Sequence, residues 1–287
     1  MPLSVVTGTT SGIGVELALA LARRGYDLAL VNRSAERTQP VVDQIKQAAP
    51  SATVTVYEAD LTDQARIQAV AGEIRAAHPS VHALFNNAGV LLSETRRTAD
   101  GREVHLAVNV LAPYLLTVLL RPALAAGAVE GGRAVVVTPS SSAVFKTDPF
   151  DPAALDTPEK QGLFGAYAQS KLAVASLAEA LAPDYARDRI DLYAADPGGT
   201  RTSMTASDAA PFIIRLIQRF LPGPEKGAAN LLIPLDAAYS GRSGLLISGG
   251  KVRALPNGGG TTENKAALLA LCESLTGVSA TDSSSSA

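Results

Sequence analysis

Short apolar runs alternate along the chain with longer segments of helical periodicity. The apolar runs are rich in β-branched residues and stop at turn-forming residues, which is typical of strands. Segments between them, such as 15–24 and 63–77, repeat apolar residues at the spacing of amphipathic helices. The predicted strands are residues 3–7, 26–31, 53–57, 81–85, 134–137, 190–194 and 245–248. This alternation predicts a single-domain, doubly wound α/β fold, with a parallel sheet of about seven strands and helices on both faces.

Two long insertions follow strands and therefore lie at the carboxyl edge of the sheet, where such folds bind ligands. Residues 143–166 contain three prolines, and residues 203–225 contain an apolar, basic stretch. We expect both to form substrate walls within a catalytic domain of residues 1–278, followed by a disordered Ser-rich tail at 279–287. The stretch 211–220 could be a lid, a dimer contact or a helix that contacts a membrane.

Composition excludes several classes of function. A net charge of −2, sparse aromatic residues and no Trp argue against a nucleic-acid partner. The single cysteine, Cys272, excludes an intramolecular disulfide and fits a cytoplasmic location. The most apolar run, 110–120, is too short to span a bilayer, so we expect no transmembrane segment. His78, His82 and His105 lack metal-ligand spacing, so we expect them to be structural or exposed and predict no metal site.

A glycine-rich loop joins the first strand to the first helix. Its glycines are Gly8, Gly12 and Gly14, a spacing that differs from G-x-G-x-x-G but meets the same physical needs. Gly8 allows a tight turn, Gly12 allows close approach to a pyrophosphate, and Gly14 lets the helix pack on the strand. The helix N-terminus then offers backbone amides and a positive dipole to phosphates. The sequence therefore predicts a Rossmann-type dinucleotide site whose loop also includes Thr10, Ser11 and Ile13.

The end of the second strand indicates which dinucleotide is preferred. An acid there would accept hydrogen bonds from the ribose and repel a 2′-phosphate, but this chain has no acid there, and Arg33 follows the strand. A guanidinium binds phosphate well, so we favour NADP(H) over NAD(H), although Arg33 could be an ordinary surface cation. Other strand ends supply further candidate cofactor contacts: Asp60 and Leu61 for adenine, Asn87, Ala88 and Gly89 for ribose, and Pro197, Gly198, Thr200 and Thr202 for the nicotinamide end.

Tyr167 and Lys171 provide candidate proton chemistry. They are four residues apart, so on a helix they share one face. A free phenol titrates near ~10, and we expect the neighbouring ammonium to lower that pKa so that Tyr167 can act as general acid or base. Serines 140–142 follow the fifth strand, where a hydroxyl could hold the substrate oxygen. Asn109 interrupts an apolar helix, where its amide could kink the helix or order a water.

Together these motifs resemble the short-chain dehydrogenase/reductase family over residues 3–251. Segments 98–103, 105–111, 167–173 and 224–228 resemble its retinol dehydrogenase and WW-domain oxidoreductase-like branch. The resemblance implies a catalytic set of Asn109, a serine, Tyr167 and Lys171, with Tyr167 and Lys171 also contacting the cofactor, and a homodimer or homotetramer. Ser141 fits the family serine best, and Ser140 is the runner-up.

We therefore predict an NADP(H)-preferring oxidoreductase that interconverts a carbonyl and an alcohol. Phe145, Phe150, Phe212 and Ile213 in the insertions hint at an apolar small-molecule substrate. Two alternatives stay open: reduction of a carbon–carbon double bond on the same scaffold, and an NADP(H)-binding sensor or scaffold protein without turnover. The sequence leaves the substrate and the direction of the reaction open.

Overall fold

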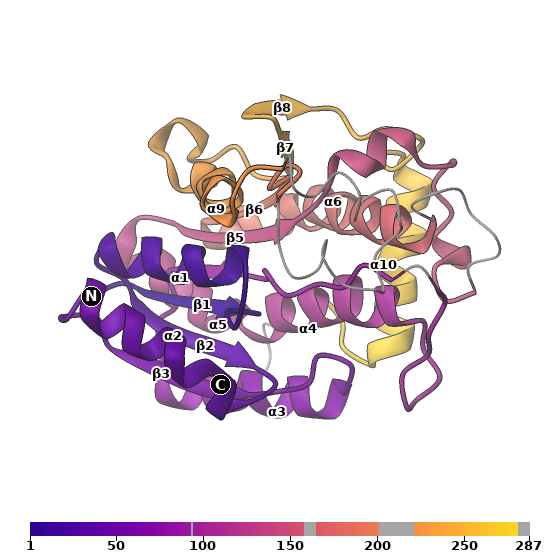
Figure 1. Cartoon of the computed structure of the whole chain (residues 1–287). Helices are drawn as coiled ribbons and strands as arrows, with labels where there is room; N and C mark the ends of the chain where they lie inside the picture. Colours follow the sequence, from indigo (N-terminus) through magenta and orange to yellow (C-terminus); the bar gives the residue numbers. More distant parts are fainter. Residues whose placement is uncertain (93, 158–164, 201–220, 281–287) are drawn as a thin grey trace.

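The computed structural model describes residues 1–92, 94–157, 165–200 and 221–280. They form one eight-stranded sheet in the order β3-β2-β1-β4-β5-β6-β7-β8 (Figure 1). The strands are β1 (Leu3–Thr7), β2 (Asp27–Asn32), β3 (Val54–Glu58), β4 (Ala83–Phe85), β5 (Ala134–Pro139), β6 (Ile190–Ala195), β7 (Leu245–Ser248) and β8 (Lys251–Arg253). Neighbouring strands from β3 to β7 pair in parallel, which confirms the predicted parallel sheet.

Helices cover both faces of the sheet, as the sequence predicts. The α-helices are α1 (Ile13–Arg23), α2 (Ala35–Ala48), α3 (Gln64–Ala77), α4 (Ala112–Leu119), α5 (Arg121–Gly131), α6 (Gly165–Tyr185), α9 (Pro224–Leu232) and α10 (Thr262–Thr276). Shorter helical turns are η1 (Leu106–Leu111), η2 (Ser142–Lys146), η3 (Pro152–Ala154), η4 (Ala186–Asp188), η6 (Ile233–Leu235) and η7 (Ala237–Tyr239). Successive strand residues enter opposite cores: Val5 packs with α3, α4 and α6, whereas Val6 packs with α1 and α2.

Three strands differ from the prediction by two residues or more. β5 ends at Pro139 rather than at residue 137. β4 starts at Ala83 rather than at residue 81, because the Val81 N–H donates to Ala123 O outside the strand ladder. β8 is a short antiparallel addition at the edge, paired with β7 through a turn at Gly249 and Gly250, both with positive φ. Exposed edge strands of this kind carry too little apolar patterning to be predicted from the sequence.

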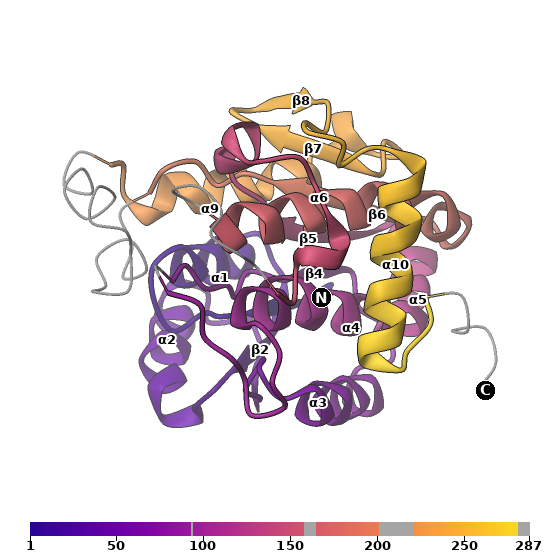
Figure 2. The same cartoon turned by 90° about the vertical axis from the view of Figure 1, so that its right-hand side faces the viewer.

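The last helix closes the outside of the domain. Figure 2 shows α10 crossing α6, and its Leu268 and Cys272 are fully buried against that core. Tyr114 of α4 donates its hydroxyl hydrogen to Val278 O at 2.8 Å. Ala280, which the sequence assigns to a disordered tail, is buried and accepts a hydrogen bond from Arg121, so the ordered chain extends past residue 278. Residues 281–287 lie outside the described residues.

None of the described helices is by itself long and apolar enough to cross a membrane. Leu106–Leu119 and Arg121–Gly131 meet the length and composition test only as a pair, and they are bent by 60° relative to each other.

Candidate active site

The three loop glycines lie where β1 leads into α1, with Gly8 and Gly12 in the connection and Gly14 in the first turn of the helix. Gly8 and Gly12 have φ of +71° and +58°, which side chains rarely adopt. A Cβ on Gly8 would lie 2.7 Å from Ala88 Cα, and one on Gly14 would lie 2.0 Å from Gly8 O. Gly12 precedes α1 and has no side chain to cap it, so the first-turn amides of α1 face the space above β1. This cradle fits a dinucleotide pyrophosphate.

Asparagine side chains fix the strand ends around this cradle. Asn87 Nδ2 donates to Thr7 O at 3.0 Å and to Gly8 O at 2.9 Å, which bridges the ends of β1 and β4. Asn32, at the end of β2, is buried and exchanges two 2.8 Å hydrogen bonds with Thr9. Asn87, which the sequence predicts as a candidate ribose contact, thus also holds two strand ends together. The Asn32–Thr9 pair was not predicted, because an asparagine between a strand and a turn carries no sign of its partner 23 residues away.

A single cleft of about 1200 Å³ brings most of the predicted residues together. It lies at the carboxyl ends of the strands, as ligand sites do in such folds. The predicted residues that line it are Gly8, Thr10, Ser11, Gly12, Ile13, Gly14, Arg33, Asp60, Leu61, Asn87, Ala88, Gly89, Ser140, Ser141, Tyr167, Lys171, Pro197, Gly198 and Thr200. Thr202 and residues 203–220 lie outside the described residues.

Two arginines, not one, flank the far end of this cleft. Arg33 is exposed after β2, and Arg37 is exposed on the first turn of α2. Ser34 caps that helix, since its Oγ accepts from Arg37 N at 3.2 Å. Arg37 was missed in the sequence, although its position four residues after Arg33 is a signal that could have found it.

Tyr167 and Lys171 meet as predicted, on the first turns of α6. The Ser141 side chain lies close enough to the Tyr167 phenol for hydrogen bonding to lower the pKa of Tyr167. Lys171 Nζ lies 5.8 Å from the centroid of the Tyr167 ring and donates to Pro139 O at 2.9 Å. Ser140 instead points into the protein, where its Oγ donates to Lys171 O at 3.0 Å. Of the two candidate serines, Ser141 is therefore the one that faces the phenol.

The pKa of Tyr167 differs from the prediction. Burial raises the pKa of Tyr167 to about 12, with a further increase from Asp196 and an opposing decrease from the Ser141 hydrogen bond. Burial also lowers the pKa of Lys171 to about 8. The prediction that Lys171 depresses the pKa of Tyr167 is thus wrong for the protein without ligand. The ammonium lies beside the ring rather than at the hydroxyl, and desolvation disfavours charge on both groups.

Asn109 lies just behind the cleft in a distorted helix. It belongs to the π-helical turn η1, where Ala112 N–H donates to Ala107 O, five residues back. Pro113, four residues after Asn109, has no N–H to donate to the Asn109 carbonyl. The Asn109 side chain binds both the N–H and the O of Val90, at 2.8 and 3.1 Å. The helix is irregular here, as predicted, and the amide side chain anchors the start of the loop after β4.

The nicotinamide end of the cleft includes one acid that the sequence analysis missed. Asp196 follows β6, lines the cleft and is buried. Its Oδ1 accepts from Gly198 N and its Oδ2 from Ser248 Oγ, both at 2.8 Å. These bonds fix the Pro197–Gly198 turn to β7. The sequence does not indicate this role of Asp196, because an Asp before Pro-Gly also occurs in ordinary turns.

The apolar wall comes mainly from a segment that the sequence did not connect with substrate binding. Leu91, Leu92, Val104 and Val108 line the cleft, and all belong to the loop after β4 or to the helix that follows it. The two predicted insertions contribute less to the described lining: Ala143 and Lys146 come from the first insertion, and Leu221 comes from the second.

The described aromatic residues of the first insertion do not line this cleft. Phe150 is buried in the core, and the Phe145 ring lies 5.0 Å below the Arg253 guanidinium. Phe212 and Ile213 lie outside the described residues. The hint of an apolar substrate from Phe145 and Phe150 was therefore misplaced, although the cleft has an apolar wall from other residues.

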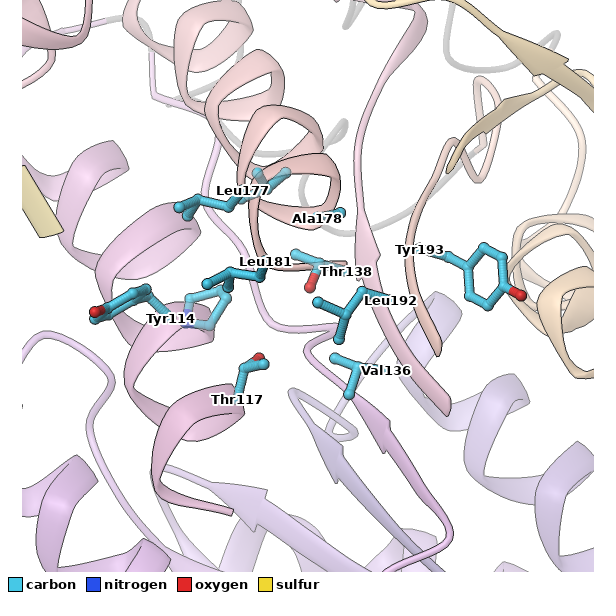
Figure 3. A pocket seen from close by; sticks show the side chains of 11 residues that line it. Tyr114, Thr117, Val136, Thr138, Leu177, Ala178, Leu181, Leu192 and Tyr193 are labelled. Atoms are coloured by element: carbon cyan, nitrogen blue, oxygen red, sulfur yellow. The ribbon is translucent and has the colours of Figure 1, made fainter. Parts of the chain in front are cut away.

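A second, small cavity of about 30 Å³ lies between α4, α6 and the sheet (Figure 3). Leu177, Leu181 and Leu192 surround it together with Thr117 and Thr138. It has room for about one water. The cavity belongs to the packing of α4 on α6 and contains none of the predicted site residues. Among the described residues, no three His, Cys, Asp or Glu side chains form a group that could hold a metal.

The chain matches the family model of the short chain dehydrogenases over residues 3–211. It belongs to that family. Among curated proteins it is 37% identical over 237 residues to polyprenol dehydrogenase of Mus musculus, covering 80% of this chain and 70% of that protein. It is 35% identical over 231 residues to retinol dehydrogenase 12 of Bos taurus, covering 79% of this chain and 71% of that protein. These relatives confirm the retinol dehydrogenase-like branch.

Solved structures agree on the fold. A short chain dehydrogenase from Salmonella enterica subsp. enterica serovar Typhi matches with a TM-score of 0.67 and 27% identity, covering 86% of this chain and 94% of that chain. The family establishes that the chain is an oxidoreductase of alcohols and carbonyls that uses a nicotinamide dinucleotide. Other structures of this fold hold NADH or NADP, so the fold leaves the choice of cofactor open.

Proposed function

We propose that this protein is an NADP(H)-preferring oxidoreductase that interconverts an apolar alcohol and its carbonyl, with Tyr167 as the general acid and base. The observation that carries the proposal is the contact of Tyr167 with Ser141 and Lys171 inside the cleft that also contains the glycine cradle. A nucleotide sensor would need the cradle but not this phenol, hydroxyl and ammonium together.

The side chains suit reduction directly. With its pKa near 12, Tyr167 keeps its proton at neutral pH and donates it to the substrate oxygen as negative charge develops there. The Ser141 hydroxyl, next to the phenol, donates a hydrogen bond to the same oxygen. Lys171, with its pKa near 8, is mostly protonated at pH 7 and holds a positive charge beside the phenol ring. When bound, the nicotinamide supplies the hydride, and in oxidation its positive charge favours the phenolate.

The substrate class follows from the wall after β4. Leu91, Leu92, Val104 and Val108 present aliphatic surface to the cleft, on which a hydrocarbon chain can pack. Two relatives are named for the isoprenoid alcohols polyprenol and retinol. We therefore infer an apolar primary or secondary alcohol, and long-chain allylic alcohols and aldehydes are the first compounds to test.

Substitution of Tyr167 tests the chemistry. Turnover of a panel of aldehydes, ketones and alcohols is measured with NADPH and NADP⁺, and Tyr167→Phe should lower kcat by about 10³-fold because it removes the proton donor. NADPH binding, followed by fluorescence, should survive. Tyr185→Phe, at the other end of the same helix, is the matched control and should turn over like the wild type. Wild-type turnover in Tyr167→Phe would refute the assignment, and an enone in the panel reports any reduction at carbon–carbon bonds.

Arg33 and Arg37 support the preference for NADP(H). Both guanidiniums line the cleft beyond the end of β2, where a 2′-phosphate would accept their hydrogen bonds. Arg33→Asp should shift the ratio of kcat/KM values towards NADH by about 100-fold, as a lost phosphate contact becomes a repulsion. Arg75→Asp, an exposed change on α3, controls for net charge. An unchanged ratio in Arg33→Asp would remove the support for NADP(H).

A further inference from the structure

A buried carboxylate and imidazole lie directly behind the proposed proton donor. Glu103 is fully buried and His105 is 2% exposed. His105 Nδ1 lies 2.8 Å from Glu103 Oε1, and the other carboxylate oxygen accepts from Leu106 N at 2.9 Å. The His105 ring meets the Tyr167 ring edge-on, with centroids 6.3 Å apart and planes at 69°. Neither Glu103 nor His105 lines the cleft, so any influence on the reaction passes through their neighbours.

Hydrogen bonding fixes the tautomer of His105. Leu92 N donates to His105 Nε2 at 3.0 Å, and a backbone N–H can only donate. Nε2 is therefore the unprotonated nitrogen, and the ring proton is on Nδ1, where it is donated to the Glu103 carboxylate. The carboxylate thus determines which nitrogen is free to hold the Leu92 backbone.

Both neighbours of His105 belong to the site. Leu92 is part of the apolar wall of the cleft. Tyr167 has the His105 ring on one side and the Lys171 ammonium 5.8 Å from its ring centroid. A shift of His105 would therefore move a substrate-facing wall and the phenol together. Proton transfer is sensitive to such movement, since misplacement of a reacting group by about 1 Å can cost about 100-fold in rate.

We propose that Glu103 and His105 are positioning residues of this active site, which hold the Tyr167 ring and the Leu92 wall in place for reaction. The proposal rests on the function proposed for Tyr167. A buried carboxylate is costly, and apolar side chains of similar volume would fill the same space at a lower cost, so a purely space-filling role does not explain the pair.

Glu103→Gln is a sharp test because it keeps the shape and disrupts the hydrogen bonds. The amide has one acceptor oxygen, whereas both carboxylate oxygens accept in the native protein. If the amide oxygen of the Glu103→Gln side chain faces His105, the amide NH₂ faces the Leu106 N–H, and two donors cannot form a hydrogen bond. If the amide NH₂ faces His105, it needs an unprotonated Nδ1. The ring proton then moves to Nε2, where it meets the Leu92 N–H, and that hydrogen bond is lost. At least one of the three bonds must break. Glu73→Gln, at an exposed ion pair with Arg66, is the matched control.

The first measurement does not depend on turnover. The chain has three histidines, so ¹⁵N-histidine labelling, with His105→Phe for assignment, resolves the His105 nitrogens. We expect a neutral ring protonated at Nδ1 in the wild type, and faster hydrogen exchange of the Leu92 amide in His105→Phe. A ring protonated at Nε2, or unchanged exchange at Leu92, would overturn the proposal even if the enzyme is active.

The second measurement is kinetic. Per NADPH-binding site, Glu103→Gln should lower kcat by about tenfold or more while the Kd for NADPH stays unchanged, because the cradle is untouched. His105→Gln, which restores an acceptor near Leu92 but removes the ring, should retain more activity than His105→Ala. Counting sites by NADPH binding corrects for misfolded protein. A Glu103→Gln kcat per site equal to that of Glu73→Gln would overturn the proposal.

A different result separates this inference from the proposed function. If the wild type turns over nothing in the panel, the proposed function fails. The ¹⁵N spectrum of His105 and the hydrogen exchange of Leu92 then decide the inference.

Discussion

Helix α6 has a tyrosine beside a cation at each end, and the two pairs are built differently. At its start, Lys171 Nζ lies 5.8 Å from the Tyr167 ring centroid, and at its end Arg121 Cζ lies 4.4 Å from the Tyr185 ring centroid. Arg121 donates to two carboxylates, Asp184 at 2.6 Å and Asp188 at 2.7 Å. Lys171 donates to a backbone carbonyl, and no carboxylate within the described ranges forms an ion pair with it.

The difference separates a structural cation from a reactive one. Burial lowers the pKa of Arg121, but hydrogen bonds to the two aspartates outweigh this effect and raise it, so the charge is held at every accessible pH. Burial without a carboxylate lowers the pKa of Lys171 to about 8, so its proton is mobile near neutrality. Tyr185 is fully buried in the core, whereas Tyr167 opens on the cleft. A tyrosine beside a cation therefore stabilises one end of the helix, and another such pair is available for proton transfer at the other end.

The largest effect on stability should come from breaking the structural pair. Arg121→Met leaves Asp184 and Asp188 beside an apolar side chain, which should cost about 3 kcal/mol of unfolding free energy, measured by urea titration. Arg187→Met removes an exposed partner of the same Asp184 and should cost less than about 0.5 kcal/mol. Equal losses in the two variants would show that the Arg121 pair is no more structural than a surface ion pair.

The sequence predicted well which residues lie at the carboxyl ends of the strands, around the cleft. Parallel strands bring their carboxyl ends to one edge, so Gly8, Asn87 and Ser141 could be assigned to one cleft from the sequence alone. Helical spacing likewise brought Lys171 to the same face as Tyr167. These are local rules, and they require no knowledge of side-chain partners that are distant in the sequence.

Predictions that depended on distant partners failed or were absent. The sign of the Tyr167 pKa shift depends on burial by surrounding segments, which the spacing of Tyr167 and Lys171 does not reveal. Glu103 and His105 lie more than 60 residues before Tyr167, and the sequence suggested only a structural or exposed histidine. The apolar wall after β4 was missed because its leucines have no strand or helix periodicity.

The reactive pair can be tested by removing its charge. The pKa of Lys171 is about 8 in the folded protein and usually 10.5, so below pH 8 both states are protonated and folding bears a desolvation cost of about 3 kcal/mol. Lys171→Met removes that cost but also loses the hydrogen bond to Pro139 O, worth about 1 kcal/mol. The variant should be more stable than the wild type by about 2 kcal/mol at pH 7, and the gain should disappear as the pH rises through 8 towards 10.5.

Urea titrations of the ligand-free protein at pH 7 and pH 10 measure the difference in unfolding free energy between Lys171→Met and the wild type. Turnover of Lys171→Met should be lost at both pH values. Lys46→Met, at an exposed position of α2, should change stability little at either pH. A Lys171→Met protein less stable than the wild type at pH 7 would mean that the ammonium is solvated or paired in solution.

The smallest effect should come from the phenol of the structural pair. The Tyr185 hydroxyl donates to Thr117 O at 3.4 Å, a long bond, and Tyr185→Phe keeps the ring against Arg121. The loss of unfolding free energy should therefore be below about 1 kcal/mol, with kcat unchanged. The same substitution at Tyr167 should instead lower kcat by about 10³-fold. If Tyr185→Phe lowered kcat per NADPH-binding site, the two ends of α6 would be coupled, and Tyr185 could no longer be treated as belonging to the scaffold alone.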